Sequence, residues 1–222
     1  MFRKFLLLLF PPKCILCKKL LGNGETDLCQ YCRENAPECK KSRLRFSYVA
    51  GWTSVWYYKD NIRSSIHRFK FRNHRHYAKA YGRILAARLK KDDFLDFDIL
   101  TYVPVSLLRQ MHRGYDQVEL ICATLAEELD ITPMRCLKKI RNTPPQSGIK
   151  GVAARRANVL GAYTCPHPGE VKGKRILLLD DVITTGATVS ECARVLQTAG
   201  ATKVICASMA VREYKTKENV GE

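Results

Sequence analysis

The feature that most constrains the fold is residues 175–201, which read RILLLDDVITTGATVSECARVLQTAGA. Within this stretch, residues 176–179 form an unbroken apolar run, typical of a strand that is buried on both faces of a parallel sheet. From Thr188 onward the apolar residues fall at helical spacing, and Gly200 stands where a helix is expected to end. The stretch therefore predicts a strand, a loop and a helix, which is the repeating unit of an α/β fold with a parallel sheet.

Two acids and a loop rich in threonine follow this strand and are candidate ligand residues. They are Asp180, Asp181, Thr184, Thr185, Gly186, Ala187 and Thr188. Open α/β sheets bind ligands at the carboxyl ends of their strands, where acids can accept hydrogen bonds from vicinal hydroxyls. The loop opens a helix whose free N–H groups favour an anion, and its glycine lets the backbone approach a phosphate. The pattern predicts a site for a ribose 5-phosphate; the alternative is an ordinary loop after solvated acids.

Charge supplies a second constraint. The chain has 38 Lys and Arg against 21 Asp and Glu, a net charge of +17, and residues 1–24, 61–91 and 131–169 contain no acid. This excess is more than solubility or one phosphate ligand requires, so it indicates a polyanionic partner such as nucleic acid. The candidate contacts are six cations from the two later windows: Lys70, Arg72, Arg75, Arg141, Arg155 and Arg156.

Aromatic residues among these cations favour single-stranded over duplex DNA. Phe71 and Tyr77 would stack on unpaired bases, whose faces are hidden in a duplex. The alternatives are a solvated basic surface and aromatic side chains that are buried in the core.

The cysteine pattern near the amino terminus predicts a metal site. Cys14-x-x-Cys17 and Cys29-x-x-Cys32 supply four thiolates, which suit a closed and structural tetrahedral zinc site. A redox dithiol and an iron–sulfur cluster are the alternatives, and Cys39 falls outside the pattern. We interpret residues 1–40 as a zinc-binding module that is too small to hold a core without its metal.

The first residues, MFRKFLLLLFPPKC, resemble a signal peptide only superficially. Their apolar core spans residues 5–10, and two prolines and a lysine replace the small residues of a cleavage site. The run is too short to cross a bilayer. We expect a cytoplasmic protein whose amino terminus packs on the protein itself or touches the inner face of the membrane.

The rest of the chain predicts one domain over 41–213 and a disordered polar tail over 214–222. We expect strands at 46–58 (one or two, broken near Gly51), 99–103, 136–141 and 203–210. We expect two helices within 61–91, separated by a basic elbow at 70–76, and a third helix that ends at Leu129. Residues 142–148 form a loop by composition, and 166–173 is a linker. The long basic segment that contains this loop, within 135–158, either closes over the ligand or is a mobile surface loop.

Several sequence blocks together resemble the ComF family of competence proteins and GntX-like relatives. The blocks are PPKCILC, LCQYC, VPVSLLRQMHRGYDQ, RNTPPQSGIKGVAARRANVLGAY and ILLLDDVITTGATVSECARVL. The resemblance implies a zinc finger on a type I phosphoribosyltransferase-like parallel sheet flanked by helices. It implies a site for phosphoribosyl pyrophosphate (PRPP), with Mg²⁺ bound beside it if the transferase is active. It implies that the loop with Arg113 and Gly114 holds the pyrophosphate. Asp116 departs from the family, which usually has asparagine at that position.

The same resemblance implies a role in the uptake of single-stranded DNA during natural transformation, beside a helicase-like ATPase of the competence machinery. Two other functions stay open. The chain is either an active phosphoribosyltransferase acting on an unidentified nucleobase or a regulator that senses PRPP or a nucleotide. The charge favours the first function and the intact ligand motif favours the others, and one protein can combine them.

Overall fold

The computed structural model describes residues 11–40, 44–144 and 146–213 of the 222-residue chain. The amino-terminal segment that we expect to pack on the protein or touch the membrane, and the tail that we predict to be disordered, lie outside these residues.

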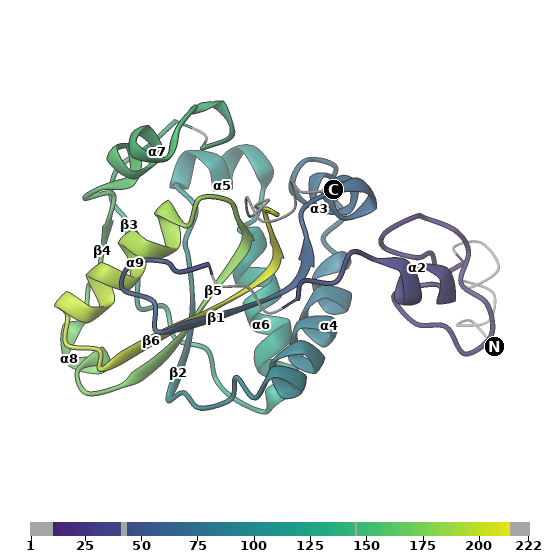
Figure 1. The fold of residues 1–222 in the computed structure, drawn as a ribbon, viewed down its shortest axis with the longest axis horizontal. Coiled ribbons are helices and arrows are strands. Elements are labelled where there is room, and N and C mark those ends of the chain that lie inside the picture. The colour runs from purple at the N-terminus through teal and green to yellow at the C-terminus, as the bar shows by residue number, and fades with distance from the viewer. Residues whose placement is uncertain (1–10, 41–43, 145, 214–222) are drawn as a thin grey trace, which may run out of the picture.

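Four parallel strands form the central sheet in the order β1-β6-β5-β2 (Figure 1). They are β1 (Gly51–Tyr57), β6 (Lys203–Val211), β5 (Arg175–Ile183) and β2 (Ile99–Tyr102). Strand β5 pairs with β6 on one side and with β2 on the other, which explains its continuous apolar run. The predicted α/β class with a parallel sheet is therefore confirmed.

Helices cover both faces of the sheet (Figure 1). On one face lie α3 (Asp60–Phe71), α4 (Tyr77–Asp92) and α6 (Gln117–Leu129), and on the other lies α9 (Ala187–Thr198). The side chains of β5 alternate between two apolar cores: Leu177 and Leu179 pack with the first group of helices, whereas Ile176 and Leu178 pack with α9. This alternation decides the orientation of the two acids that follow.

A smaller layer lies beyond α9, and we call its described residues, 136–144 and 146–164, the cover. It contains β3 (Lys138–Lys139), η1 (Gln146–Gly148), α7 (Val152–Val159) and β4 (Tyr163–Thr164). Strands β3 and β4 pair in antiparallel fashion, and both α7 and β4 contact α9. The strand predicted over 136–141 is only two residues long, because its partner β4 is equally short.

Two segments that were predicted to be irregular contain short helices. Helix α5 (Leu107–Arg113) lies between β2 and α6, with Ser106 at its amino end and Gly114 in the left-handed conformation (φ 76°) at its carboxyl end. Helix α8 (Pro168–Val171) lies in the predicted linker and starts with a proline, which suits the first turn of a helix.

The amino-terminal module, with helix α2 (Gln30–Asn35), docks on α3 and α4 (Figure 1). Ile15 and Leu16 belong to the same apolar core as residues of α3. The buried Arg68 of α3 donates hydrogen bonds of 2.7 Å to the carbonyl oxygens of both Ile15 and Leu16. The module is thus stabilised by the larger domain as well as by any metal that it holds.

Candidate functional site

The two predicted ligand acids lie on β5 and point to opposite faces of the sheet. Continuing the alternation of the strand, Asp181 faces α3 and Asp180 faces α9. Asp181 forms an ion pair with Lys70 at the end of α3, with Nζ 2.8 Å from a carboxylate oxygen. Lys70, a predicted DNA contact, therefore lies within the candidate ligand site.

Asp180 has an unusual protonation equilibrium. Burial raises the pKa of its carboxyl, the neighbouring Asp181 adds repulsion, and together they bring it to about 8 against the opposing charge of Lys70. One of its oxygens accepts a hydrogen bond of 2.8 Å from the backbone N–H of Asp181. A carboxyl that titrates near neutrality can either donate or accept a hydrogen bond to a ligand hydroxyl.

The threonine-rich loop forms the amino end of α9, as predicted. Together with Asp180 and Gln146 it lines a cavity of about 20 Å³. Gly186 adopts the left-handed conformation (φ 74°), and a Cβ at this position would collide with the ring of Phe46. The glycine is thus required for a turn and for the close approach of a side chain.

Gln146 is a site residue that the sequence analysis missed. Its Oε1 is buried and has no hydrogen-bond partner within the described part of the chain, while its Nε2 donates to the carbonyl oxygen of Arg155 at 3.3 Å. A buried and unpaired acceptor beside the threonine-rich loop can accept a hydrogen bond from a ligand that carries O–H or N–H donors. The TPPQSG composition predicted only a loop.

Arg155 links the cover to the ligand loop. Its Nη1 donates to Thr184 Oγ1 at 3.3 Å, and its Nε donates to the carbonyl oxygen of Ile149 at 2.8 Å. Two of the six predicted DNA contacts, Lys70 and Arg155, thus contact residues of the predicted ribose-phosphate motif at 180–188. The basic segment for which two options were given, within 135–158, thus lies against the threonine-rich loop at Arg155 and at Gln146.

The predicted pyrophosphate residues lie beside the basic elbow. The guanidinium of Arg113 stacks 4.7 Å from the ring centroid of Phe71 and donates to Gln117 Oε1 at 2.6 Å. Burial lowers the pKa of Arg113, against the opposing charge of Asp181. Arg75 donates to the carbonyl oxygen of Gly114 at 3.2 Å. These contacts hold Arg113 and Gly114 on the side of the site that faces α3.

The remaining predicted DNA contacts have different surroundings. Arg72 and Arg156 are exposed and form no ion pair or side-chain hydrogen bond with any described residue. Arg141 is also exposed, but its Nη2 donates to the carbonyl oxygen of Leu160 at 2.7 Å. Tyr77 is only 5% exposed, so this side chain is not available to stack on bases.

Asp116, the departure from the family pattern, has a structural role. One carboxylate oxygen accepts from the backbone N–H groups of Val118 and Glu119, and the other accepts from the N–H of Val105. Asp116 is therefore the N-cap of α6 and fixes the end of β2 to that helix.

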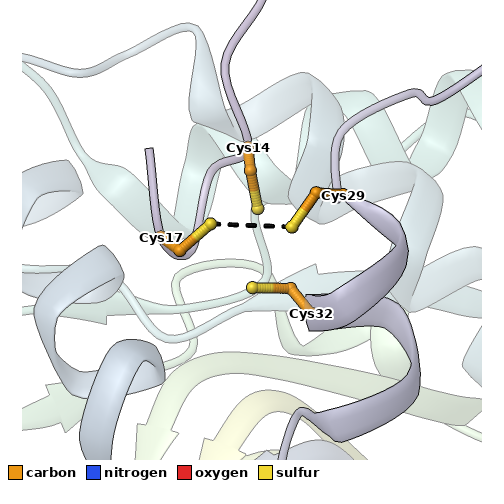
Figure 2. Close-up of side chains that lie close together, drawn as sticks. All are labelled: Cys14, Cys17, Cys29 and Cys32. Atoms are coloured by element: carbon orange, nitrogen blue, oxygen red, sulfur yellow. Dashed lines mark hydrogen bonds between the residues drawn. The ribbon is translucent and has the colours of Figure 1, made fainter. Parts of the chain in front are cut away.

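Four cysteines form the candidate metal centre, and Figure 2 shows their sulfur atoms pointing toward one another. Cys14 and Cys17 flank a tight turn, Cys29 precedes α2 and Cys32 lies within it. Their Sγ atoms all lie within 4.8 Å of one another, and those of Cys17 and Cys29 are 3.6 Å apart. Zn–S bonds of about 2.3 Å in a tetrahedron place sulfurs about 3.8 Å apart, so the cluster can hold such an ion.

Cys39 is not part of this cluster. It is buried, and its Sγ donates a weak hydrogen bond of 3.4 Å to the carbonyl oxygen of Lys40. Its position outside the two CxxC pairs predicted that it would not belong to the cluster. Burial raises the pKa of its thiol to about 11.

Comparisons with known proteins agree with the motifs. The phosphoribosyl transferase domain family matches residues 120–220. Competence protein F of Haemophilus influenzae is 27% identical over 215 residues, which cover 86% of this chain and 93% of that protein. Competence protein ComFC of Streptococcus pneumoniae is 27% identical, covering 86% and 96%. The DNA utilization protein YhgH of Escherichia coli O157:H7 is 27% identical, covering 89% and 96%. The resemblance to the ComF family is therefore confirmed.

Two larger enzymes are among the solved structures that match part of the chain. The allosteric regulatory enzyme of purine biosynthesis matches with a TM-score of 0.42 and 23% identity, over 64% of this chain and 29% of that one. Glutamine PRPP amidotransferase from B. subtilis matches with a TM-score of 0.43 and 22% identity, over 64% and 30%. The chain thus spans less than a third of each enzyme's length.

Within the described residues, no helix is both long and apolar enough to cross a membrane.

Proposed function

We propose that this homologue of competence proteins F and ComFC handles single-stranded DNA during natural transformation and binds a PRPP-type ligand at the carboxyl end of β5. One observation carries the proposal: cations from both later acid-free windows contact the ligand motif directly. Lys70 pairs with Asp181 at 2.8 Å, and Arg155 donates to Thr184 at 3.3 Å. The basic surface and the ligand site therefore share residues.

Each part of the site has a role in this proposal. The carboxylates of Asp180 and Asp181 accept hydrogen bonds from the ribose hydroxyls. The backbone N–H groups and hydroxyls of residues 184–188 bind the 5-phosphate, because the amino end of α9 favours an anion. Arg113 and Gly114 hold the pyrophosphate, whose charge is partly neutralised by Mg²⁺.

The DNA-binding part of the proposal depends on the exposed cations. Arg72 and Arg156 are free to contact phosphates, and the exposed ring of Phe71 offers a stacking surface already backed by Arg113. The partner is a helicase-like ATPase, and the location is the cytoplasm, at the inner face of the membrane. The metal of the cysteine cluster is structural zinc, because four thiolates leave no open position for chemistry.

The intact acid pair supports a second candidate function, transfer of the phosphoribosyl group to a nucleobase. A ring nitrogen would form a bond to C1 of PRPP while the bond from C1 to the pyrophosphate oxygen breaks. Pyrophosphate leaves with the electron pair, and the ring-nitrogen proton passes to water. A regulator that binds PRPP or a nucleotide without turnover would need the same ligand residues. It would differ from a transferase only in forming no nucleotide and releasing no pyrophosphate.

Calorimetric titration with PRPP and Mg²⁺, and an anisotropy titration with a single-stranded oligonucleotide, test the proposal on the same full-length protein. We expect both to bind. Asp181→Asn combined with Thr185→Ala should abolish PRPP binding, whereas Thr202→Ala, at the other end of the sheet, should not. Failure of the unmutated protein to bind PRPP would contradict the ligand assignment, and failure to bind the oligonucleotide would contradict the DNA assignment. Pyrophosphate release in the presence of a nucleobase would identify the transferase.

A further inference from the structure

The last turn of α3 contacts three separate parts of the protein through three consecutive residues. Arg68 points to the amino-terminal module, where it donates to a backbone carbonyl at 2.7 Å. The carbonyl oxygen of Phe69 accepts a hydrogen bond from the hydroxyl of Tyr115, which directly follows the predicted pyrophosphate segment. Lys70 pairs with Asp181 at 2.8 Å. The end of this helix therefore connects the module with two parts of the candidate ligand site.

The contact on the module belongs to its first metal-binding turn. Ile15 and Leu16 are the two residues enclosed by the first CxxC pair. Nη2 of Arg68 donates to the carbonyl oxygens of both at 2.7 Å, and Ser65 Oγ donates to that of Ile15 at 2.6 Å. Ser65 in turn accepts a hydrogen bond of 2.7 Å from the hydroxyl of Tyr81. A metal that binds the flanking thiolates would fix the shape of this turn, and the turn supplies the acceptors for two buried side chains of α3.

Arg68 depends on this turn because it has no carboxylate partner. Its residue is only 7% exposed, and it forms no ion pair within residues 11–40, 44–144 and 146–213. Besides the two carbonyl oxygens, it donates from Nε to the hydroxyl of Tyr77 at 3.3 Å. If the turn opened, the guanidinium would lose two charge-assisted hydrogen bonds while still buried. Relief of that cost requires the end of α3 to shift toward water.

We propose that Arg68 is a positioning residue of the ligand site. The metal-bound turn holds Arg68, and the end of α3 then keeps Lys70 against Asp181. This inference rests on the proposed zinc and on the proposed phosphoribosyl site. Lys70 opposes the rise in the pKa of Asp180, so its displacement would leave fewer ionised carboxylates at pH 7.5 to accept hydrogen bonds from the ribose hydroxyls. Zinc should therefore strengthen ligand binding, and the ligand should strengthen zinc binding by the same factor.

The reactivity of the Lys70 amine tests this inference on the full-length protein without any ligand. Acylation of Lys70, followed by mass spectrometry, should be slow in the zinc-loaded protein, because the side chain is 19% exposed and paired. Removal of zinc and Arg68→Met should each make it several-fold faster, and Arg68→Lys, which keeps a donor for the turn, should retain part of the protection. The exposed Lys90 of α4 is the internal reference and should react at one rate throughout.

Arg83→Met is the matched control. Arg83 of α4 also attaches the module to the larger domain, since its Nη2 and Nε donate to the two carboxylate oxygens of Asp27 at 2.5 and 2.8 Å. It is exposed and lies on a different helix from Lys70, so its loss should leave the reactivity of Lys70 unchanged. Equal effects of Arg68→Met and Arg83→Met would show a general loosening of the module and would overturn the inference.

Ligand binding provides the second readout. By calorimetry at pH 7.5, zinc removal and Arg68→Met should each weaken ribose 5-phosphate binding by about fivefold or more, and Arg83→Met should not. Competition with a zinc-selective chelator should show that ribose 5-phosphate tightens zinc binding by the same factor in the unmutated protein. Zinc analysis and melting temperatures show that each variant is loaded and folded. If Arg68→Met loses its zinc, Ser65→Ala, which removes one hydrogen bond to the turn, should shift the same readouts in the same direction.

The two readouts separate this inference from the proposed function. A protein that does not bind ribose 5-phosphate contradicts the proposed phosphoribosyl site, while the reactivity of Lys70 still decides whether Arg68 positions it. A Lys70 amine that reacts at the same rate with and without zinc, and in Arg68→Met, would overturn the inference even if the ligand binds.

Discussion

The ammonium of Lys70 lies 2.8 Å from a carboxylate oxygen of Asp181 and joins the end of α3 to the end of β5. The two side chains are 19% and 12% exposed, so water screens this pair less than a surface ion pair. The elbow that follows Lys70 contacts the Arg113–Gly114 segment as well. A ligand that binds Asp181 must therefore share or displace a cation from the basic elbow.

The first prediction concerns the pH dependence of ligand binding. Burial and the charge of Asp181 raise the pKa of Asp180 to about 8, and Lys70 opposes that rise. The affinity for ribose 5-phosphate should therefore increase with pH between 7 and 9, where the ligand phosphate is already dianionic and Asp180 loses its proton. Lys70→Met should move the midpoint of this rise in affinity to higher pH, because the charge that lowers the Asp180 pKa is lost, and Lys70→Arg should not. Calorimetry across this range measures the midpoint, and a midpoint unchanged in Lys70→Met would contradict the assignment.

The second prediction is that Asp180 destabilises the fold at neutral pH. Because its folded pKa lies well above the ordinary value of 3.8, the unfolded chain loses the proton first, and stability falls as the pH rises from about 4 toward about 8. Asp180→Asn should therefore raise the melting temperature at pH 7.5, by about 2–4 °C for each kcal/mol recovered. The gain should shrink at pH 5.

Asp181→Asn is the matched control for this effect. It makes the same carboxyl-to-amide change one residue away but leaves the ammonium of Lys70 without its partner, so it should lower the melting temperature at pH 7.5. Thermal unfolding of both variants at the two pH values decides the matter. An equal change of melting temperature in both variants would show that the burial of Asp180 does not cause the lower stability at pH 7.5.

The sequence predicted the local parts of the site better than their arrangement. Residues 176–188 contain their own signals: an apolar run, two acids and a glycine at the start of a helix. The pair between Lys70 and Asp181 joins residues 111 positions apart, and no local pattern encodes it. Alternation along a strand does predict that adjacent acids point to opposite faces, but only the packing shows which face lies against α3.

Helix α5 and Gln146 show a second limit of sequence patterns. Leu107, Leu108 and Met111 are all more than 60% exposed, so α5 lacks the buried apolar stripe by which a helix is usually recognised. Gln146 lies in a segment whose prolines and glycine predict irregular structure, and its importance comes from the loop that it covers.

The third prediction concerns the metal. Elemental analysis should find one zinc per chain, and Cys14→Ser or Cys32→Ser should lose it. Cys39→Ser, at an equally buried thiol outside the cluster, should retain it. Removal of the metal should unfold residues 11–40 and give rapid hydrogen exchange there. The sheet should stay protected, because the module contacts the larger domain through Arg68 and a shared apolar core but contributes no strand to the sheet. Zinc-free protein with full protection in this module would contradict the prediction.

The last prediction concerns DNA binding by the two exposed arginines that lie outside the ligand site. Arg72→Glu with Arg156→Glu should weaken binding of every single-stranded sequence alike, because phosphate contacts carry no sequence information. Each contact on single-stranded DNA contributes about −0.7 to the slope of log affinity against log salt, so losing both should flatten the slope by about 1.4. Lys172→Glu with Lys174→Glu is the control, since it makes the same charge change at exposed lysines by the amino end of β5. Anisotropy titrations at several salt concentrations provide both measurements. If the two double variants lose affinity equally, net charge rather than this surface attracts DNA, and the assignment of Arg72 and Arg156 fails.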